Sequence, residues 1–109
     1  MPLDPQHPAT QQEALDHIAR GGVVVYWRPG CPFCEGLAAG LGDDRDRAAW
    51  TNIWQEDSAR DYVESLNDGN ATVPTVVTRD THFIAADGAA VERVRALLTT
   101  SRSTEDSIG

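Results

Sequence analysis

The sequence contains no lysine, and its nine basic residues, all of them arginine, are outnumbered by seventeen acidic residues. With a net charge of −8, the protein lacks the basic surface that nucleic acids and anionic membranes attract, so we expect neither as a partner. Long apolar runs are also missing: the longest, at residues 23–27, is far shorter than the roughly 20 residues that span a bilayer. The first residues show no secretory signal pattern, and we therefore expect a cytoplasmic protein.

Cysteine is scarce, because Cys31 and Cys34 are the only two in the chain. Two cysteines cannot form a disulfide framework, and a close pair in a chain without a signal peptide indicates catalysis or metal binding. Zinc requires four ligands, and the other candidates, His7, His17 and His82, do not have ligand spacing, so we expect no metal. An incidental buried pair and an iron–sulfur site at a dimer interface are the alternatives to catalysis.

The two cysteines stand at the junction of a predicted strand and a predicted helix. The apolar run at 23–27 is typical of a buried central strand, and residues 32–41 predict a helix with Pro32 at its first position. Cys31 would then lie at the helix N-terminus, where unpaired N–H groups and the helix dipole stabilise a thiolate. We expect Cys31 to be a solvent-accessible nucleophile and Cys34, one turn into the helix, to be a partly covered resolving thiol.

Local patterns predict the remaining elements. A capping box at Thr10 and Glu13 starts a first helix, which ends at Gly21. The elements expected after the cysteine pair are, in order, a strand over residues 49–55, a helix capped by Ser58, a hairpin of strands at 73–78 and 81–84, and a helix capped by Asp87. We expect Trp50 and Trp54 to pack in the interior.

The order helix, strand, helix, strand, helix, hairpin, helix predicts an α/β protein. A βαβ unit followed by a hairpin and a closing helix gives a four-stranded mixed sheet flanked by helices. We expect one domain over residues 10–100, preceded by a flexible arm at 1–9 and followed by a disordered tail at 101–109.

Two motifs carry a family resemblance: Cys-Pro-Phe-Cys at residues 31–34, after the strand, and Thr72-Val73-Pro74 at the start of the hairpin. In this order and at this distance, they resemble the glutaredoxin branch of the thioredoxin fold. The resemblance implies a thioredoxin-like, glutaredoxin-type fold with an extra N-terminal helix. It also implies that Pro74 is cis and faces Cys31, with the main chain of Val73 pairing with a thiol substrate.

A narrower resemblance is to the actinobacterial mycoredoxins, which use mycothiol in place of glutathione. It rests on residues 67–76 and on Val24-Val25-Tyr26 leading to Gly30 and Cys31. Ordinary glutaredoxins carry a Gly-Gly pair and an acidic pair after the hairpin, where the glutathione carboxylate binds. The corresponding residues 84–88 are Ile-Ala-Ala-Asp-Gly and lack the glycine pair, which favours mycothiol over glutathione as the co-substrate.

The resemblance assigns Cys31 and Cys34 to catalysis and Arg28, Thr72, Val73, Pro74 and Asp87 to substrate binding. Arg28 would stabilise the thiolate and attract the small thiol, and Asp87 would combine substrate contact with its role as a helix cap.

The function that these resemblances imply is the reduction of mixed disulfides between mycothiol and proteins, without a tightly bound cofactor. The expected partners are disulfide-bearing protein substrates, mycothiol and its reductase or thioredoxin reductase, and we expect a monomer. One alternative is an electron donor that thioredoxin reductase reduces directly and that supplies a reductase such as ribonucleotide reductase. Another is a non-catalytic redox sensor or binding module.

Overall fold

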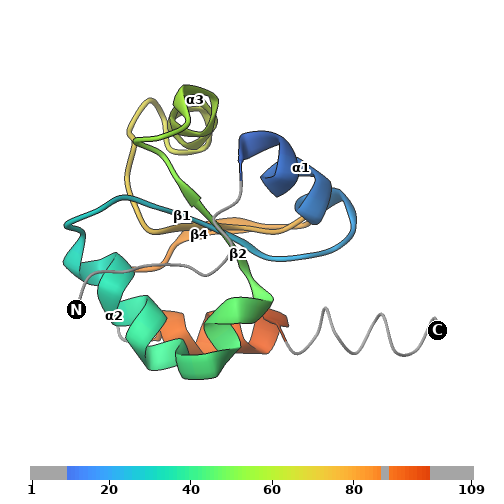
Figure 1. Cartoon of the computed structure of the whole chain (residues 1–109), viewed down its shortest axis with the longest axis vertical. Helices are drawn as coiled ribbons and strands as arrows, with labels where there is room; N and C mark the ends of the chain where they lie inside the picture. Colours follow the sequence, from blue (N-terminus) through green and yellow to red (C-terminus); the bar gives the residue numbers. More distant parts are fainter. Residues whose placement is uncertain (1–9, 87–88, 99–109) are drawn as a thin grey trace.

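The computed structural model describes residues 10–86 and 89–98, which form a single sheet with helices on both faces (Figure 1). The elements are α1 (Gln11–Ala19), β1 (Val24–Trp27), α2 (Pro32–Leu41), the 3-10 helix η1 (Gly42–Arg47), β2 (Ala49–Asn52), α3 (Asp57–Leu66), β3 (Thr75–Val77) and β4 (His82–Ile84), followed by a last helix over residues 90–98. The element order confirms the predicted one, and the N-terminal helix is present.

The sheet has the strand order β2-β1-β3-β4, with β1 parallel to β2 and antiparallel to β3. Strands β3 and β4 form the predicted hairpin. Figure 1 shows α2 and the last helix against one face of the sheet, with α1 and α3 against the other. Every residue of β1 is buried, as expected for a central strand covered on both faces. The four-stranded mixed sheet flanked by helices is confirmed.

Helix α1 has well-defined signals at both ends. Thr10 Oγ1 accepts a hydrogen bond from Glu13 N–H, and Glu13 Oε1 accepts one from Thr10 N–H, so the predicted capping box is confirmed. At the other end, Gly21 N–H donates to the Ile18 carbonyl and Gly22 N–H to the His17 carbonyl, which is the Schellman pattern. Gly21 occupies the positive-φ position that this pattern requires, at φ +87°.

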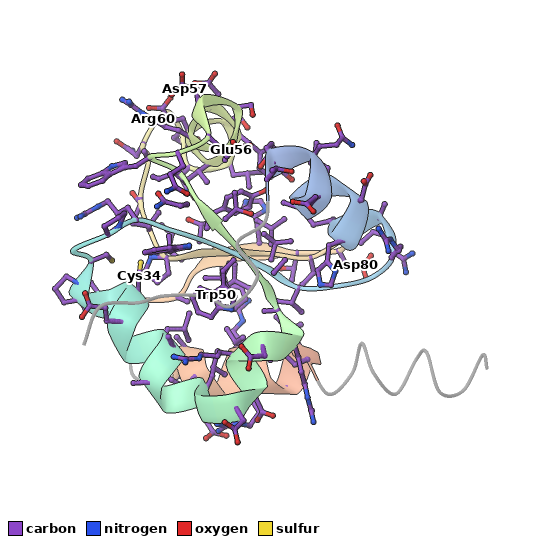
Figure 2. All side chains as sticks on the ribbon, in the orientation of Figure 1. Cys34, Trp50, Glu56, Asp57, Arg60 and Asp80 are labelled. Atoms are coloured by element: carbon purple, nitrogen blue, oxygen red, sulfur yellow. The ribbon has the colours of Figure 1, made fainter. Side chains whose placement is uncertain are left out.

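A buried polar contact joins α1 to the sheet and to α3. The Tyr26 hydroxyl donates to Gln11 Oε1 at 3.0 Å, and Gln11 N–H donates to Glu56 Oε1 at 3.0 Å. Figure 2 shows Glu56 at the start of α3, on the side that faces α1. The Tyr26 ring also packs 5.6 Å from that of Tyr62, and burial raises the pKa of the Tyr26 phenol. The first turn of α1 is therefore bonded to the central strand as well as to α3.

On the opposite face, the last helix packs closely against α2. A side chain at Gly40 would collide with Val91, because a Cβ atom there would lie 2.6 Å from Val91 Cγ2. Arg95 fixes the same contact by donating to the Gly40 carbonyl at 2.9 Å and to Asp44 Oδ2 at 3.0 Å. Gly40, which weakens α2 as an isolated helix, thus allows the last helix to approach α2 closely.

The hairpin strands are shorter than the predicted 73–78 and 81–84, and two other boundaries also differ from the sequence prediction. Strand β2 ends at Asn52 instead of extending toward residue 55, because Asn52 Oδ1 accepts a hydrogen bond from Trp54 N–H at 2.8 Å and turns the chain. Helix α3 begins at Asp57 after Glu56, whose carbonyl accepts from Ala59 N–H, so Ser58 lies inside the helix and is not its cap.

Other predictions lie outside the described residues: the arm at 1–9, the tail at 101–109 and the cap at Asp87. Within residues 10–86 and 89–98, no helix combines the length and the apolar character needed to cross a bilayer.

The contact between Tyr26 and Gln11 predicts a measurable stability change. Tyr26→Phe should lower the free energy of unfolding by about 1 kcal/mol, because it leaves the buried Gln11 Oε1 without its donor. Urea denaturation of the wild type, both single variants and the Gln11→Ala/Tyr26→Phe double variant measures the coupling. If the stability losses of the two single variants simply add in the double variant, the two side chains do not interact, and the hydrogen bond between Tyr26 and Gln11 is contradicted.

Candidate redox site

The site lies at one edge of the sheet, where the topology brings three loops together. Strands β1 and β2 are parallel and end at this edge, whereas β3 runs the other way and begins there. The loops after β1 and β2 and the loop before β3 therefore meet. Ligand sites of open α/β sheets occur at such carboxyl-terminal edges.

Cys31 is the N-cap of α2, with Pro32 as the first helical residue. The Cys31 Sγ atom accepts a hydrogen bond from Cys34 N–H at 3.3 Å. A helix N-terminus with an N–H group directed at the sulfur is the environment that stabilises a thiolate. The sequence prediction that Cys31 lies at the start of the helix is thus correct, although Cys31 precedes the first turn and does not belong to it.

Both cysteines are free thiols, and both are more buried than expected. Cys31 is only 3% exposed and Cys34 is fully buried, so the predictions of an accessible Cys31 and a partly covered Cys34 were wrong. The reason is the loop before β3: the carbonyl oxygen of Val73 lies 3.8 Å from Cys31 Sγ and covers it. Cys31 Sγ is therefore covered on the side that faces Val73.

Burial is the largest cause of a raised pKa at the Cys34 thiol, whose Sγ is enclosed between the sheet and α2 (Figure 2). The hydrogen bond between the Cys34 and Cys31 side chains raises this pKa further. A hydrogen bond to the main chain of Arg28 and the positive charge of Arg28 lower it. Cys34 therefore keeps its proton at neutral pH.

The peptide bond between Val73 and Pro74 is cis, as the family resemblance implies. Val73 is buried, and its carbonyl faces Cys31. The Pro74 carbonyl accepts a hydrogen bond from Ala85 N–H at 2.8 Å, which joins this loop to the end of β4. In the part of the chain that the structure describes, no hydrogen-bond partner contacts the main-chain N–H of Val73.

The loop before β3 is fixed by Thr75. Its hydroxyl donates to the Thr72 carbonyl at 2.6 Å and accepts from Asn67 Nδ2 at 3.0 Å. The main chain of Thr72 thus has a structural role here, and its side chain remains half-buried.

Arg28, the first residue after β1, lies near both Cys34 and Trp54. Its guanidinium Nη1 donates to the Pro29 carbonyl at 3.2 Å, and its Cζ atom lies 5.6 Å from the centre of the Trp54 ring. The structure therefore brings together Cys31, Cys34, Val73 with Pro74, and Arg28, whereas Asp87 lies outside the described residues.

A groove of about 340 Å³ runs beside the cysteine pair, between α2 and the last helix. It is lined by Pro32, Phe33, Gly36, Leu37, Ala85, Ala86, Ala90 and Val91. Phe33, one of the two residues between the cysteines, is 57% exposed at this groove. The described lining side chains are apolar, so this part of the groove offers apolar contact area.

Sequence reasoning missed Trp54. This residue was expected in the interior with Trp50, but only Trp50 is buried, with its indole N–H donating to the Arg45 carbonyl at 2.7 Å. Trp54 is 63% exposed because the turn at Asn52 takes the chain away from the sheet. An asparagine two residues before the tryptophan was the available signal, since Asn favours such turns.

Among the described residues, no three His, Cys, Asp or Glu side chains gather in a group that could hold a metal ion. The only thiols in the chain are the two at the redox site.

The fold is similar to that of a solved thioredoxin, and the sequence is similar to that of a mycoredoxin. The crystal structure of a thioredoxin from Malassezia sympodialis aligns with a TM-score of 0.51 and 14% identity, covering 91% of this chain and 95% of the thioredoxin. This likeness shows a thioredoxin-like fold. Mycoredoxin 1 from two strains of Corynebacterium glutamicum is 39% identical over 54 residues, which make up 50% of this chain and 66% of the mycoredoxin. The match thus spans slightly less than two thirds of that relative.

The family model described as glutaredoxin matches residues 23–83, more than half of the chain. The matched segment begins before the central strand and contains the cysteine pair, the cis peptide bond and most of the hairpin. The chain therefore belongs to the glutaredoxin family.

Proposed function

We propose that this protein is a mycoredoxin-type thiol–disulfide oxidoreductase that reduces mixed disulfides between mycothiol and proteins. The observation that carries the proposal is the position of Cys31 Sγ, which caps α2, accepts the Cys34 N–H and faces the Val73 carbonyl. The similarity to a mycoredoxin supports mycothiol as the small thiol. We place this chemistry in a reducing cytoplasm, where protein thiols are the substrates to be restored.

In the first step, the Cys31 thiolate attacks the mycothiol sulfur of the mixed disulfide. The disulfide bond breaks, its electron pair goes to the protein sulfur, and the released protein thiolate takes up a proton. Cys31 is left in a mixed disulfide with mycothiol. The N–H of Cys34 and the helix N-terminus favour this cysteine as the attacking group, because both interact best with a negatively charged sulfur.

In the second step, a thiolate removes mycothiol from Cys31. A second mycothiol gives mycothiol disulfide and returns Cys31 as a thiolate. Alternatively, Cys34 loses its proton, attacks Cys31 Sγ and releases mycothiol, leaving an internal disulfide that an external thiol or reductase must reduce. Since burial raises the pKa of Cys34, the route through a second mycothiol is the faster one in this proposal.

The surrounding residues bind the substrate. The N–H of Val73, which has no hydrogen-bond partner among the described residues, pairs in this proposal with a short extended segment beside the disulfide, with Thr72 and Pro74 holding the loop in place. Arg28 contributes positive charge next to Cys34, and Asp87 is proposed as a further contact for the small thiol. We propose that the protein acts as a monomer.

The two cysteines should respond differently to substitution. Cys31→Ser should abolish reduction of a mycothiol–protein mixed disulfide because it removes the nucleophile. Cys34→Ser should keep the rate within about tenfold of the wild type, because a second mycothiol replaces the resolving thiol. The measurement is release of mycothiol from the labelled protein in the presence of mycothiol and its reductase. Full activity of Cys31→Ser would contradict the mechanism, and complete loss in Cys34→Ser would require an obligatory dithiol route.

The same assay distinguishes this function from that of an electron donor that thioredoxin reductase reduces directly. Turnover should require mycothiol, and thioredoxin reductase with its reductant should not replace it. Turnover with thioredoxin reductase alone would contradict the choice of mycothiol, whereas negligible turnover in both mixtures would favour a redox sensor.

The raised pKa of Cys34 predicts a pH-dependent stability of the reduced protein. The folded state holds the Cys34 proton more tightly than the unfolded state, in which this thiol has a pKa of about 8.5. The stability from this group is therefore complete below that pH and falls above it, by up to about 1.4 kcal/mol per pH unit.

Urea denaturation between pH 7 and 10 tests this effect, with Cys34→Ser as the control. Burial also raises the pKa of Tyr26, so only the difference between the two proteins reports on Cys34. The curve of the wild type should fall more steeply, and parallel curves would show that Cys34 titrates normally in the folded protein.

A further inference from the structure

The loop that covers Cys31 is held by a side chain from the end of α3, which the redox chemistry described above does not use. Asn67, the C-cap of α3, donates from Nδ2 to Thr75 Oγ1 at 3.0 Å, and the Thr75 hydroxyl donates to the Thr72 carbonyl at 2.6 Å. Thr72 precedes Val73, whose carbonyl oxygen lies 3.8 Å from Cys31 Sγ. Two hydrogen bonds in series thus connect the end of α3 to the loop that covers the nucleophile.

Both side chains in this series have a fixed main chain. Thr75 is fully buried and is paired with Tyr26 on one side and with Ile84 on the other. The N–H of Asn67 donates to the Val63 carbonyl at 3.1 Å, so the last turn of α3 holds it. The Thr75 hydroxyl can rotate and has one proton to donate. Because its oxygen accepts from Asn67, that proton is directed at the Thr72 carbonyl.

The other end of the loop is held by the main chain alone in the part of the chain that the structure describes. The Ala85 N–H donates to the Pro74 carbonyl at 2.8 Å. Loops held by a few hydrogen bonds open locally without unfolding of the sheet. Since Cys31 is only 3% exposed, a reagent reaches its sulfur mainly while this loop is open. Any bond that keeps the loop closed therefore controls the access to Cys31.

We propose that Asn67 is a positioning residue that keeps the loop closed over Cys31 and thereby limits the reaction to substrates that pair with the main chain of Val73. In the closed loop, small electrophiles are excluded, and the N–H of Val73 is already in place for an extended segment. The pairing with substrate rests on the proposed function, whereas the covering of Cys31 does not.

The test is a pair of opposite changes in Asn67→Ala. Alkylation of Cys31 by iodoacetamide should become about 3- to 10-fold faster, the factor expected for the loss of one hydrogen bond. The factor should be the same at every pH, because access to the sulfur changes and its ionisation does not. KM for a mycothiol–peptide disulfide should rise by a similar factor, with kcat within about twofold, because the position of Val73 is less fixed.

Three further variants show whether the series of hydrogen bonds is responsible. Thr75→Val removes the hydroxyl and should behave like Asn67→Ala, whereas Thr75→Ser keeps the hydroxyl and should stay close to the wild type. Asn70→Ala is the matched control, because Asn70 Nδ2 donates to the Asn67 carbonyl in the same turn, at 3.2 Å. This control should change neither the alkylation rate nor KM.

An unchanged alkylation rate of Cys31 in Asn67→Ala, or an equal change in Asn70→Ala, would overturn the proposal. Peptide mapping by mass spectrometry follows both cysteines, and equal acceleration at the fully buried Cys34 would show a general loosening of the fold, which also overturns it. Faster alkylation with an unchanged KM would support the covering role and contradict the pairing of substrates with Val73. If the wild type does not reduce the mycothiol disulfide, the proposed function fails and the alkylation rates alone decide the role of Asn67.

Discussion

The redox site depends on the hydrogen bond from Cys34 N–H to Cys31 Sγ, 3.3 Å long. This bond makes the reactive sulfur the cap of α2, so the start of the helix and the position of the nucleophile are one structural feature. It also separates the two cysteines chemically. The first meets an N–H donor at a helix end, while burial between helix and sheet raises the pKa of the second.

The rest of the fold holds this bond in place. Strand β1 positions the loop that leads to Cys31, and its burial on both faces fixes the strand. Gly40 allows the last helix to approach α2 closely, and Arg95 bonds to the end of α2. The loop before β3 is held by Thr75 and brings the Val73 carbonyl over the sulfur. The site is therefore buried, and in the proposed function substrates form part of their contacts with the main chain of the protein.

Local signals in the sequence were sufficient for most of the fold. The capping box at Thr10, the apolar run of β1 and Pro32 after Cys31 each act over a few residues, and their elements were predicted correctly. The motifs around Cys31 and Pro74 predicted the site through family resemblance. The burial of Cys31 could not be predicted because it depends on a tertiary contact with a loop 42 residues away. The exposure of Trp54 comes from a local turn at Asn52 that ends β2 early, a signal that the apolar pattern of residues 49–55 masked.

The central claim is that Cys31 attacks the mycothiol sulfur and carries mycothiol as an intermediate. The direct measurement is mass spectrometry of the Cys34→Ser protein, mixed with a mycothiol–protein disulfide and quenched by acid before free mycothiol is added. The account predicts that Cys31 gains the mass of one mycothiol while the substrate protein becomes a free thiol. A Cys31 disulfide with the substrate protein, or no adduct on Cys31, would contradict it.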